Sequence, residues 1–216
     1  MVTLQLRQIK VEPGHQVRLE DVDWAEFEAI LDELGNSRST RISYSNRTLT
    51  IVAPLFRHEK SKLVLRDLVA VLLDELGIDY DVSGSTTFKR KDLGKGVEPD
   101  DSFYIQNMNS VLHQDRIDLN VAPPPDLAIE VDLTSKTDIE IYEALGVPEL
   151  WRYDGGALRI DVLQDGKYEQ VEQSPTFPDW PIAELADQYL SRSRVVGGGR
   201  AKREFRDWVR EQLKTR

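Results

Sequence analysis

The spacing of apolar positions in the first part of the chain predicts two helices with a hairpin between them. Apolar residues recur at helical spacing over residues 24–34, where Asp23 supplies a cap, and again over residues 57–76. A glycine follows each stretch directly, as is typical of helix ends. Residues 40–44 and 48–52 alternate apolar and polar positions around a Ser-Asn-Arg turn, which predicts a β-hairpin.

Beyond residue 77 the pattern favours strands. A short helix is expected near residues 138–145, and a polar, proline-rich connection over residues 106–125. The strand-like stretches are 78–91, which includes a turn, and then 97–105, 127–133, 149–153, 158–163 and 167–171. This order of elements predicts an α/β (α+β) fold with a mixed β-sheet core flanked by helices.

The length of 216 residues suits one well-packed domain and is too short for two full-sized ones. We expect that domain over residues 1–190, with the N-terminal helix and hairpin preceding a core at residues 55–175. The three glycines at 197–199 predict a flexible joint within a helical tail, residues 191–216. The apolar stripe of the tail is expected to dock on the body or on another subunit.

Charge is distributed unevenly between these two parts. The whole chain carries −10, whereas residues 191–216 hold nine basic against three acidic residues and carry +6, which leaves −16 for residues 1–190. Because the tail is basic, the net negative charge of the chain does not exclude a polyanionic partner. The alternative is a solvated helix whose charges only aid solubility.

The composition limits the chemistry. Absence of cysteine excludes disulfides, thiolate catalysis and thiolate-bound metals, and the three scattered histidines argue against a multi-histidine zinc site. Any metal would therefore be held by oxygen atoms, which favours Mg²⁺ or Mn²⁺. Neither a secretory signal nor a membrane-spanning run is recognisable, so we expect a cytoplasmic protein without a membrane partner.

Three carboxylates stand out as candidate metal or catalytic residues. Asp100 follows Glu98-Pro99 in one strand-like run, while Glu130 and Asp132 lie two residues apart in the apolar run 127–133 and so share a face. Burying two unpaired carboxylates costs on the order of several kcal/mol, which a divalent cation would offset. The alternatives are a turn cap at Asp100, a cap at Asp132, and for Glu130 an ion pair with Arg152 or Lys136.

These residues suit the hydrolysis of a phosphodiester bond, which needs a cation, a carboxylate pair to hold it and a group that positions water. Asp100 and Glu130 supply the pair, the backbone carbonyl of Val131 a further ligand, and Lys136 a group that orients water. We expect His58 to be a surface histidine without a catalytic role. Four basic residues either receive phosphates or form a solvated hairpin tip: Lys89, Arg90, Lys91 and Lys95.

The arrangement of these motifs resembles the Uma-two family of restriction endonucleases, in the PD-(D/E)xK nuclease superfamily. The resemblance covers roughly residues 20–190 and rests on Glu59, Glu98-Pro99-Asp100, the run from Pro125 to Val131, and the distinctive run from Gly146 to Asp154. It implies a restriction-endonuclease-like fold with a sheet core flanked by helices, a magnesium site, catalytic Asp100 and Glu130, and Glu59 as an accessory ligand.

One departure from the superfamily motif leaves two hypotheses for the function. The lysine expected two places after the acid is Asp132 here, so its role passes to Lys136, to Lys62 or to no residue. The first hypothesis is a homodimeric, Mg²⁺-dependent endonuclease that cleaves DNA with metal-activated water, in which Glu59 and Asp132 assist. The second is a decayed nuclease fold that serves as a nucleic-acid or protein interaction module. A glycoside hydrolase is disfavoured, because the chain shows little of an aromatic-lined cleft.

Overall fold

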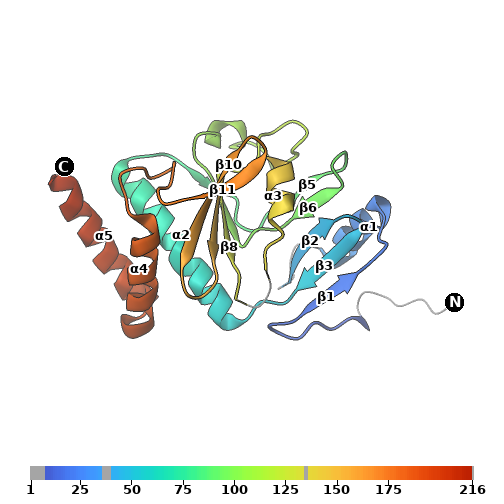
Figure 1. The fold of residues 1–216 in the computed structure, drawn as a ribbon, viewed down its shortest axis with the longest axis horizontal. Helices are drawn as coiled ribbons and strands as arrows, with labels where there is room; N and C mark the ends of the chain where they lie inside the picture. The colour runs from blue at the N-terminus through green and yellow to red at the C-terminus, as the bar shows by residue number, and fades with distance from the viewer. Residues whose placement is uncertain (1–7, 36–39, 134–135, 216) are drawn as a thin grey trace.

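Two β-sheets and five α-helices make up the fold in the computed structural model, which describes residues 8–35, 40–133 and 136–215 (Figure 1). The N-terminal sheet has the strand order β1-β3-β2-β6-β5, and the central sheet has the order β11-β10-β9-β8-β7-β4. All pairings are antiparallel except β8 with β9, so the central sheet is mixed, as the sequence predicts.

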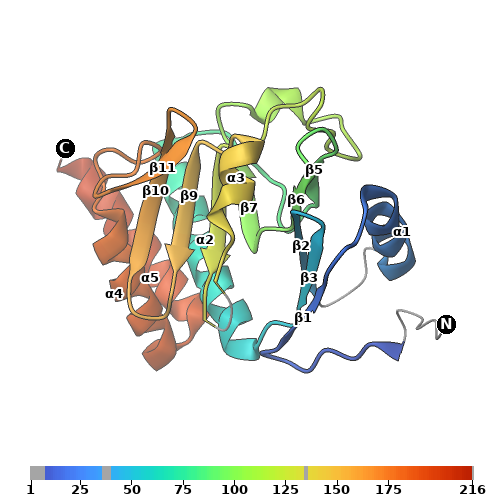
Figure 2. The ribbon, with the colours of Figure 1, turned by 45° about the vertical axis from the view of Figure 1, so that its right-hand side comes forward.

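The N-terminal sheet packs one face against a single helix, α1 (Trp24–Leu34). Figure 2 shows this helix on the side of the sheet that faces away from the central sheet. Asp23 caps α1 by accepting the backbone N–H of Glu26 at 2.9 Å, and the ring of Phe27 stacks on Tyr44 with centroids 4.4 Å apart. The strands are β1 (Gln16–Leu19), β2 (Arg41–Ser45), β3 (Thr48–Val52), β5 (Phe88–Arg90) and β6 (Lys95–Val97).

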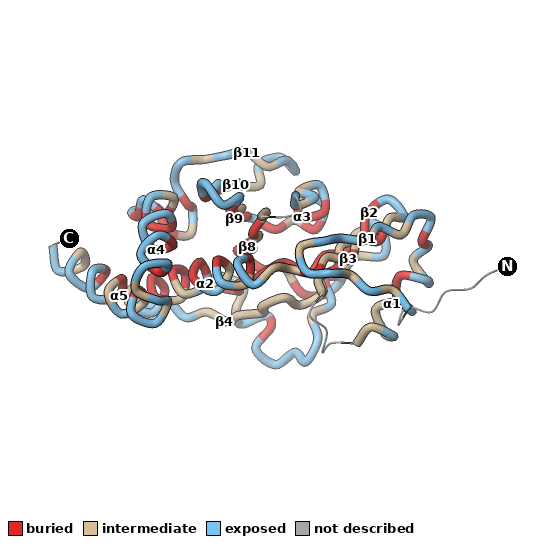
Figure 3. Tube along the Cα trace, turned by 90° about the horizontal axis from the view of Figure 1, so that it is seen from below, coloured by how far each residue is buried: buried red, intermediate tan, exposed pale blue. Residues whose placement is uncertain are grey.

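The central sheet has helices on both faces. α2 (Phe56–Leu76), α4 (Ile182–Val196) and α5 (Gly198–Lys214) cover one face and bury the largest apolar cluster, visible along α2 in Figure 3, whereas α3 (Ile139–Leu145) covers the other. The strands are β4 (Asp81–Val82), β7 (Asp101–Tyr104), β8 (Leu127–Val131), β9 (Glu149–Tyr153), β10 (Leu158–Gln164) and β11 (Lys167–Val171), and a 3₁₀ turn, η2 (Met108–Ser110), lies in the connection before β8.

The expected single strand over residues 97–105 is wrong. The chain leaves the N-terminal sheet after Val97 and enters the central sheet at Asp101, so Glu98-Pro99-Asp100 is the crossing between the two sheets. Pro99 has no N–H with which to continue a ladder. Glu98 instead holds Ile42 of β2, whose N–H it accepts at 3.1 Å, and its own N–H donates to the Ile42 carbonyl.

The C-terminal region is helical from residue 182 onward, and the sequence interpretation missed α4. The position between residues 190 and 191, where we expected the domain to end, lies inside this helix. Of the three glycines expected to form a flexible joint, only Gly197 lies between the helices, because the other two form the first turn of α5. The apolar stripe of α5 docks on the body, as one alternative predicted, and packs Phe205 and Val209 into the cluster beneath α2.

The basic residues of α5 bind acids of α2. Lys202 donates to Asp67 at 2.6 Å, and Arg206 to Asp74 at 2.9 Å. Arg210 donates to Glu75 at 2.8 Å. Much of the positive charge of the tail therefore stabilises the docking of α5 on α2. None of the helices in the described ranges is long and apolar enough to span a bilayer.

Candidate active site

A cavity of about 340 Å³ lies between the two sheets. One wall is the face of the N-terminal sheet opposite α1, with Arg18, Arg41 and Thr50 among its residues. The other wall is formed by the end of β8, the crossing and the first turns of α2 and α3. It includes His58, Asp100, Glu130, Asp132, Lys136 and Tyr142.

The pairing of β7 with β8 brings Asp100 to Glu130. Asp101 lies opposite Ile129 in this antiparallel ladder, so continuing the register by one residue places Asp100 opposite Glu130. Oδ2 of Asp100 accepts the backbone N–H of Val131 at 2.8 Å, which fixes the carboxylate at the end of β8. The two strongest candidates from the sequence therefore meet at one wall of the cavity.

Glu130 points toward α3, because Leu127, Ile129 and Val131 occupy the opposite face of β8 and pack toward α2. The hydroxyl of Tyr142 on α3 donates to its Oε1. Burial, and next the negative charge of Asp100, raise the pKa of Glu130 well above its ordinary value, while the Tyr142 hydroxyl opposes the shift. The acid pair therefore favours either a proton or a cation between its members.

His58 is a buried residue of this site, contrary to the expectation that it lies free on the surface. It is 7% exposed, and its Nε2 lies 3.0 Å from Oδ2 of Asp100. Its Nδ1 is buried without a hydrogen-bond partner among the described residues. The sequence carried a usable signal, since His58 precedes Leu65 and Leu72 by whole heptads and so lies on their buried stripe.

The other acids named from the sequence occupy less central positions. Glu59 lies beside the cavity, 36% exposed in its side chain, with Lys62 at 3.6 Å and Arg41 at 3.7 Å. Asp132 lines the cavity but also accepts the backbone N–H and the hydroxyl of Thr137, at 2.9 and 2.6 Å. It therefore caps the segment that leads into α3, as the alternative predicted, and burial is the main cause that raises its pKa.

The alternative of a purely structural ion pair for Glu130 has no counterpart in the described structure. Arg152 is the neighbour of Glu130 in the parallel β8–β9 register, yet it donates to Asp161 at 2.7 Å. Lys136 lies exposed at the edge of the cavity and forms no ion pair with Glu130 in the described ranges. The Val131 carbonyl accepts the N–H of Leu133 at 3.0 Å and retains a second lone pair.

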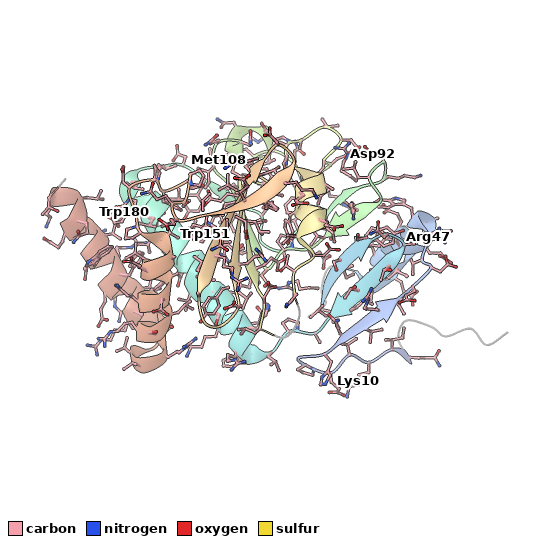
Figure 4. The ribbon with its side chains drawn as sticks, in the orientation of Figure 1. Lys10, Arg47, Asp92, Met108, Trp151 and Trp180 are labelled. Carbon is pink, nitrogen blue, oxygen red and sulfur yellow. The ribbon has the colours of Figure 1, made fainter. Side chains whose placement is uncertain are left out.

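The four basic residues expected to receive phosphates do not form one surface. Lys89 lies on the α1 side of its sheet and binds Glu28 at 2.5 Å, whereas Lys95 lies on the cavity side and donates to Ser45 at 2.6 Å. Arg90 binds Asp92, which marks the tip of the β5–β6 turn at the upper right of Figure 4, and Lys91 is exposed in the same turn. Of these four residues, only Lys95 is bonded to a residue that lines the cavity, namely Ser45.

The donor set fits a hard divalent cation that keeps several of its waters. Within the described ranges no group of three or more Asp, Glu or His residues surrounds a single point. Two adjacent carboxyl groups, Asp100 buried and Glu130 partly exposed, nevertheless suit Mg²⁺, which is commonly held by one or two carboxylates and completes its coordination with water and substrate oxygens. Removal from water and the charge of Asp100 both raise the pKa of Glu130, and a cation between the two carboxylates would oppose both effects.

Comparison with protein families assigns the chain. The family model "Uma2: Putative restriction endonuclease" matches residues 24–190. The chain belongs to the Uma2 family. The matched part of this Uma2 chain contains both acids, His58, Arg41 and Tyr142, whereas β1 and α5 lie outside it.

The fold of the Uma2 chain agrees with a solved structure. The crystal structure of "a putative nuclease belonging to DUF820 from Anabaena variabilis ATCC 29413" superposes with a TM-score of 0.52 at 14% sequence identity, and covers 78% of this chain and 99% of that chain. At this identity the likeness concerns the fold, which confirms the predicted restriction-endonuclease-like α+β architecture. A comparison with curated proteins finds no significant match.

Proposed function

We propose that this Uma2 chain is a metal-dependent nuclease that hydrolyses phosphodiester bonds in DNA. The observation that carries the proposal is the adjacent pair of Asp100, which is buried, and Glu130, which is partly exposed, at the wall of a cavity. Two adjacent acids disfavour each other's ionised form. The pair is therefore better explained as a binding site for a cation than as an interaction that stabilises the fold. Membership of a family of restriction endonucleases supports a nuclease rather than another use of two carboxylates.

Each residue of the site has its own role in this proposal. Asp100 and Glu130 hold the ion, with the Val131 carbonyl as a further oxygen donor, and Asp132 and Glu59 assist from either side. The backbone N–H of Val131 donates to Oδ2 of Asp100, against which His58 lies, and Tyr142 donates to Oε1 of Glu130, so both carboxylates are oriented without substrate. Lys136, exposed at the cavity, orients water. A bound Mg²⁺ or Mn²⁺ supplies charge stabilisation for the phosphate and lowers the pKa of water.

A nuclease fold without activity is the second candidate, because one observation favours it. Asp132 stands where the superfamily motif has lysine, and its carboxylate is engaged by Thr137. If no other cation takes over the role of that lysine, the chain binds a partner through the same cavity and does not cleave it.

The test is cleavage of supercoiled plasmid and of single-stranded DNA at low salt with Mg²⁺ or Mn²⁺. Asp100→Asn and Glu130→Gln are compared with wild type and with Glu169→Gln, which removes an exposed acid on β11 and serves as the matched control. We expect cleavage by wild type and by the control, and none by the two site variants or in chelator.

Manganese titration by calorimetry accompanies the cleavage assay. We expect Mn²⁺ to bind wild type and the Glu169→Gln control, and to bind both site variants at least about tenfold more weakly, since each loses one charged ligand. Absence of both cleavage and Mn²⁺ binding in wild type would reject the proposed enzyme. Mn²⁺ binding without cleavage of any DNA would favour the second candidate.

A further inference from the structure

The wall of the cavity formed by the N-terminal sheet has a composition that the metal site does not explain. Ile42, Tyr44, Leu49 and Ile51 point to α1, so the alternate positions of the same strands face the cavity. Across the sheet these positions form rows that follow the strand register: Gln16, Val52 and Arg41; Arg18, Thr50, Ser43 and Val97; and Thr48, Ser45 and Lys95.

A polar outer face is ordinary for an antiparallel sheet, but this one contains no acid. Its charged members are Arg18, Arg41, Lys95 and, opposite Lys95 on β5, Arg90, and its remaining polar members carry hydroxyl or amide groups. The opposite wall of the same cavity carries Asp100, Glu130, Asp132 and Asp138. The wall formed by the N-terminal sheet therefore suits phosphate oxygens. The acidic wall suits a cation, which can bind a phosphate oxygen at the same time.

Arg41 stands at the meeting point of the two walls. Ile42 pairs with Glu98 through the crossing, so the continued register places Arg41 opposite Pro99, one residue from Asp100. Its side chain is 18% exposed, and its Nε is buried without a hydrogen-bond partner among the described residues. Its nearest described acid is Glu59, whose Oε1 lies 3.7 Å from a terminal nitrogen, beyond hydrogen-bond length.

A guanidinium nitrogen that is buried without an acceptor is costly unless a ligand completes it. An oxygen of a phosphate group in the cavity would do so, and a planar guanidinium suits phosphate geometry. The same cation would offset the charge of the phosphate beside Asp100.

We propose that this face of the N-terminal sheet is the surface on which the backbone of the nucleic-acid substrate lies, with Arg41 binding the phosphate next to the acid pair and Arg18 binding another. The proposal rests on the proposed nuclease function and names its substrate surface. β1 and β2 flank β3, so Arg18 and Arg41 lie roughly 10 Å apart and reach different phosphates. No ion pair engages Arg18 in the described part of the chain.

The test is the affinity of fluorescein-labelled duplex DNA, followed by anisotropy over a series of salt concentrations. Arg18→Gln and Arg41→Gln are placed in the Glu130→Gln background, where no cleavage interferes. Lys89→Gln is the matched control, because its side chain lies on the α1 side of the same sheet. We expect each arginine variant to bind at least about tenfold more weakly. The slope of log affinity against log salt should decrease by about 0.9 per lost phosphate contact.

The outcomes separate this inference from the proposed function. If wild type cleaves DNA but both arginine variants keep the affinity and salt slope of Lys89→Gln, the surface is wrong and the nuclease stands. If wild type neither binds nor cleaves DNA, the proposed function fails and the surface fails with it. Melting temperatures check the fold of each variant. In the Glu130→Gln background Arg41→Lys is expected to keep the salt slope, because it keeps the charge. In the otherwise wild-type chain it should cleave DNA only in part, because it loses the planar fork.

Discussion

Glu149 lies at the start of β9 and gives the sharpest test of how this fold holds a buried acid. It is 2% exposed. Its carboxylate accepts the indole N–H of Trp151 at 2.6 Å, the hydroxyl of Ser174 at 2.6 Å, and both the backbone N–H and the hydroxyl of Thr176, at 3.1 and 2.6 Å. One side chain thus ties β9 to the loop that precedes α4.

Replacing Glu149 with leucine removes the acceptor and leaves these donors behind. The two hydroxyls can rotate toward other acceptors, but the indole N–H and the Thr176 N–H have fixed directions. Each buried donor left unsatisfied costs about 1–3 kcal/mol, so we expect Glu149→Leu to lower the free energy of unfolding by about 4 kcal/mol. That is a large part of the roughly 5–15 kcal/mol that stabilises a typical domain. Glu149→Gln keeps one carbonyl oxygen, and we expect it to cost about half as much.

Urea denaturation at neutral pH, followed by tryptophan fluorescence and circular dichroism, measures the change through the midpoint and the slope. Glu169→Leu on the exposed side of β11 is the control and should stay within about 0.5 kcal/mol of wild type. A loss below about 1 kcal/mol for Glu149→Leu, with an unchanged slope, would refute the view that this carboxylate organises the loop.

Three further predictions concern the site and the assembly. In chelator, the raised pKa of Glu130 means that wild type loses stability as pH rises from about 4.5 through the folded-state value. Glu130→Gln should therefore melt at a higher temperature than wild type, by a margin that grows with pH in thermal scans, and equal melting at every pH would contradict it. His58→Gln should weaken Mn²⁺ binding by about tenfold in calorimetry, as the loss of an orienting partner does, and unchanged binding would show that Asp100 needs no support. We also predict a homodimer, so light scattering should give twice the 24.7 kDa mass of the chain, and a monomer at all concentrations would argue against paired cuts in a duplex.

Local spacing was sufficient to predict the parts of the fold that are decided by neighbours in sequence. The helix near residues 57–76, the hairpin of β2 and β3, and the strand carrying Glu130 all agree with their patterns. The split of residues 97–105 was not predictable in this way, since it depends on which strand each half pairs with. Helix α4 had a readable apolar stripe, including Leu185, Tyr189 and Leu190, that was overlooked.

An acid within an apolar run does not by itself identify a functional site. An acid in an apolar run was the reason for selecting Glu130, yet Glu149 sits in an equally apolar run and is held by four donated hydrogen bonds. What distinguishes Glu130 is its surroundings, namely a second acid and a single tyrosine hydroxyl. Asp100 comes from the crossing before β7 and Tyr142 from α3, and His58 and Arg41 join them from α2 and β2. The spacing of residues along the sequence does not reveal contacts between elements that are distant in the chain.

The crossing at residues 98–100 separates the contacts of the N-terminal sheet from those of the acid pair. Glu98 is bonded to Ile42 and Thr87 of the N-terminal part, at 3.1 and 2.6 Å, whereas Asp100 is bonded to Val131 of the central sheet at 2.8 Å. If the N-terminal sheet receives the substrate as proposed, substitutions in β1, β2 and β3 should change which substrates bind while the carboxylates stay in place. A chimera that exchanges residues 16–52 between relatives while keeping Arg41, with its second junction between β3 and α2, should change the affinity for substrate and leave both carboxylates in place.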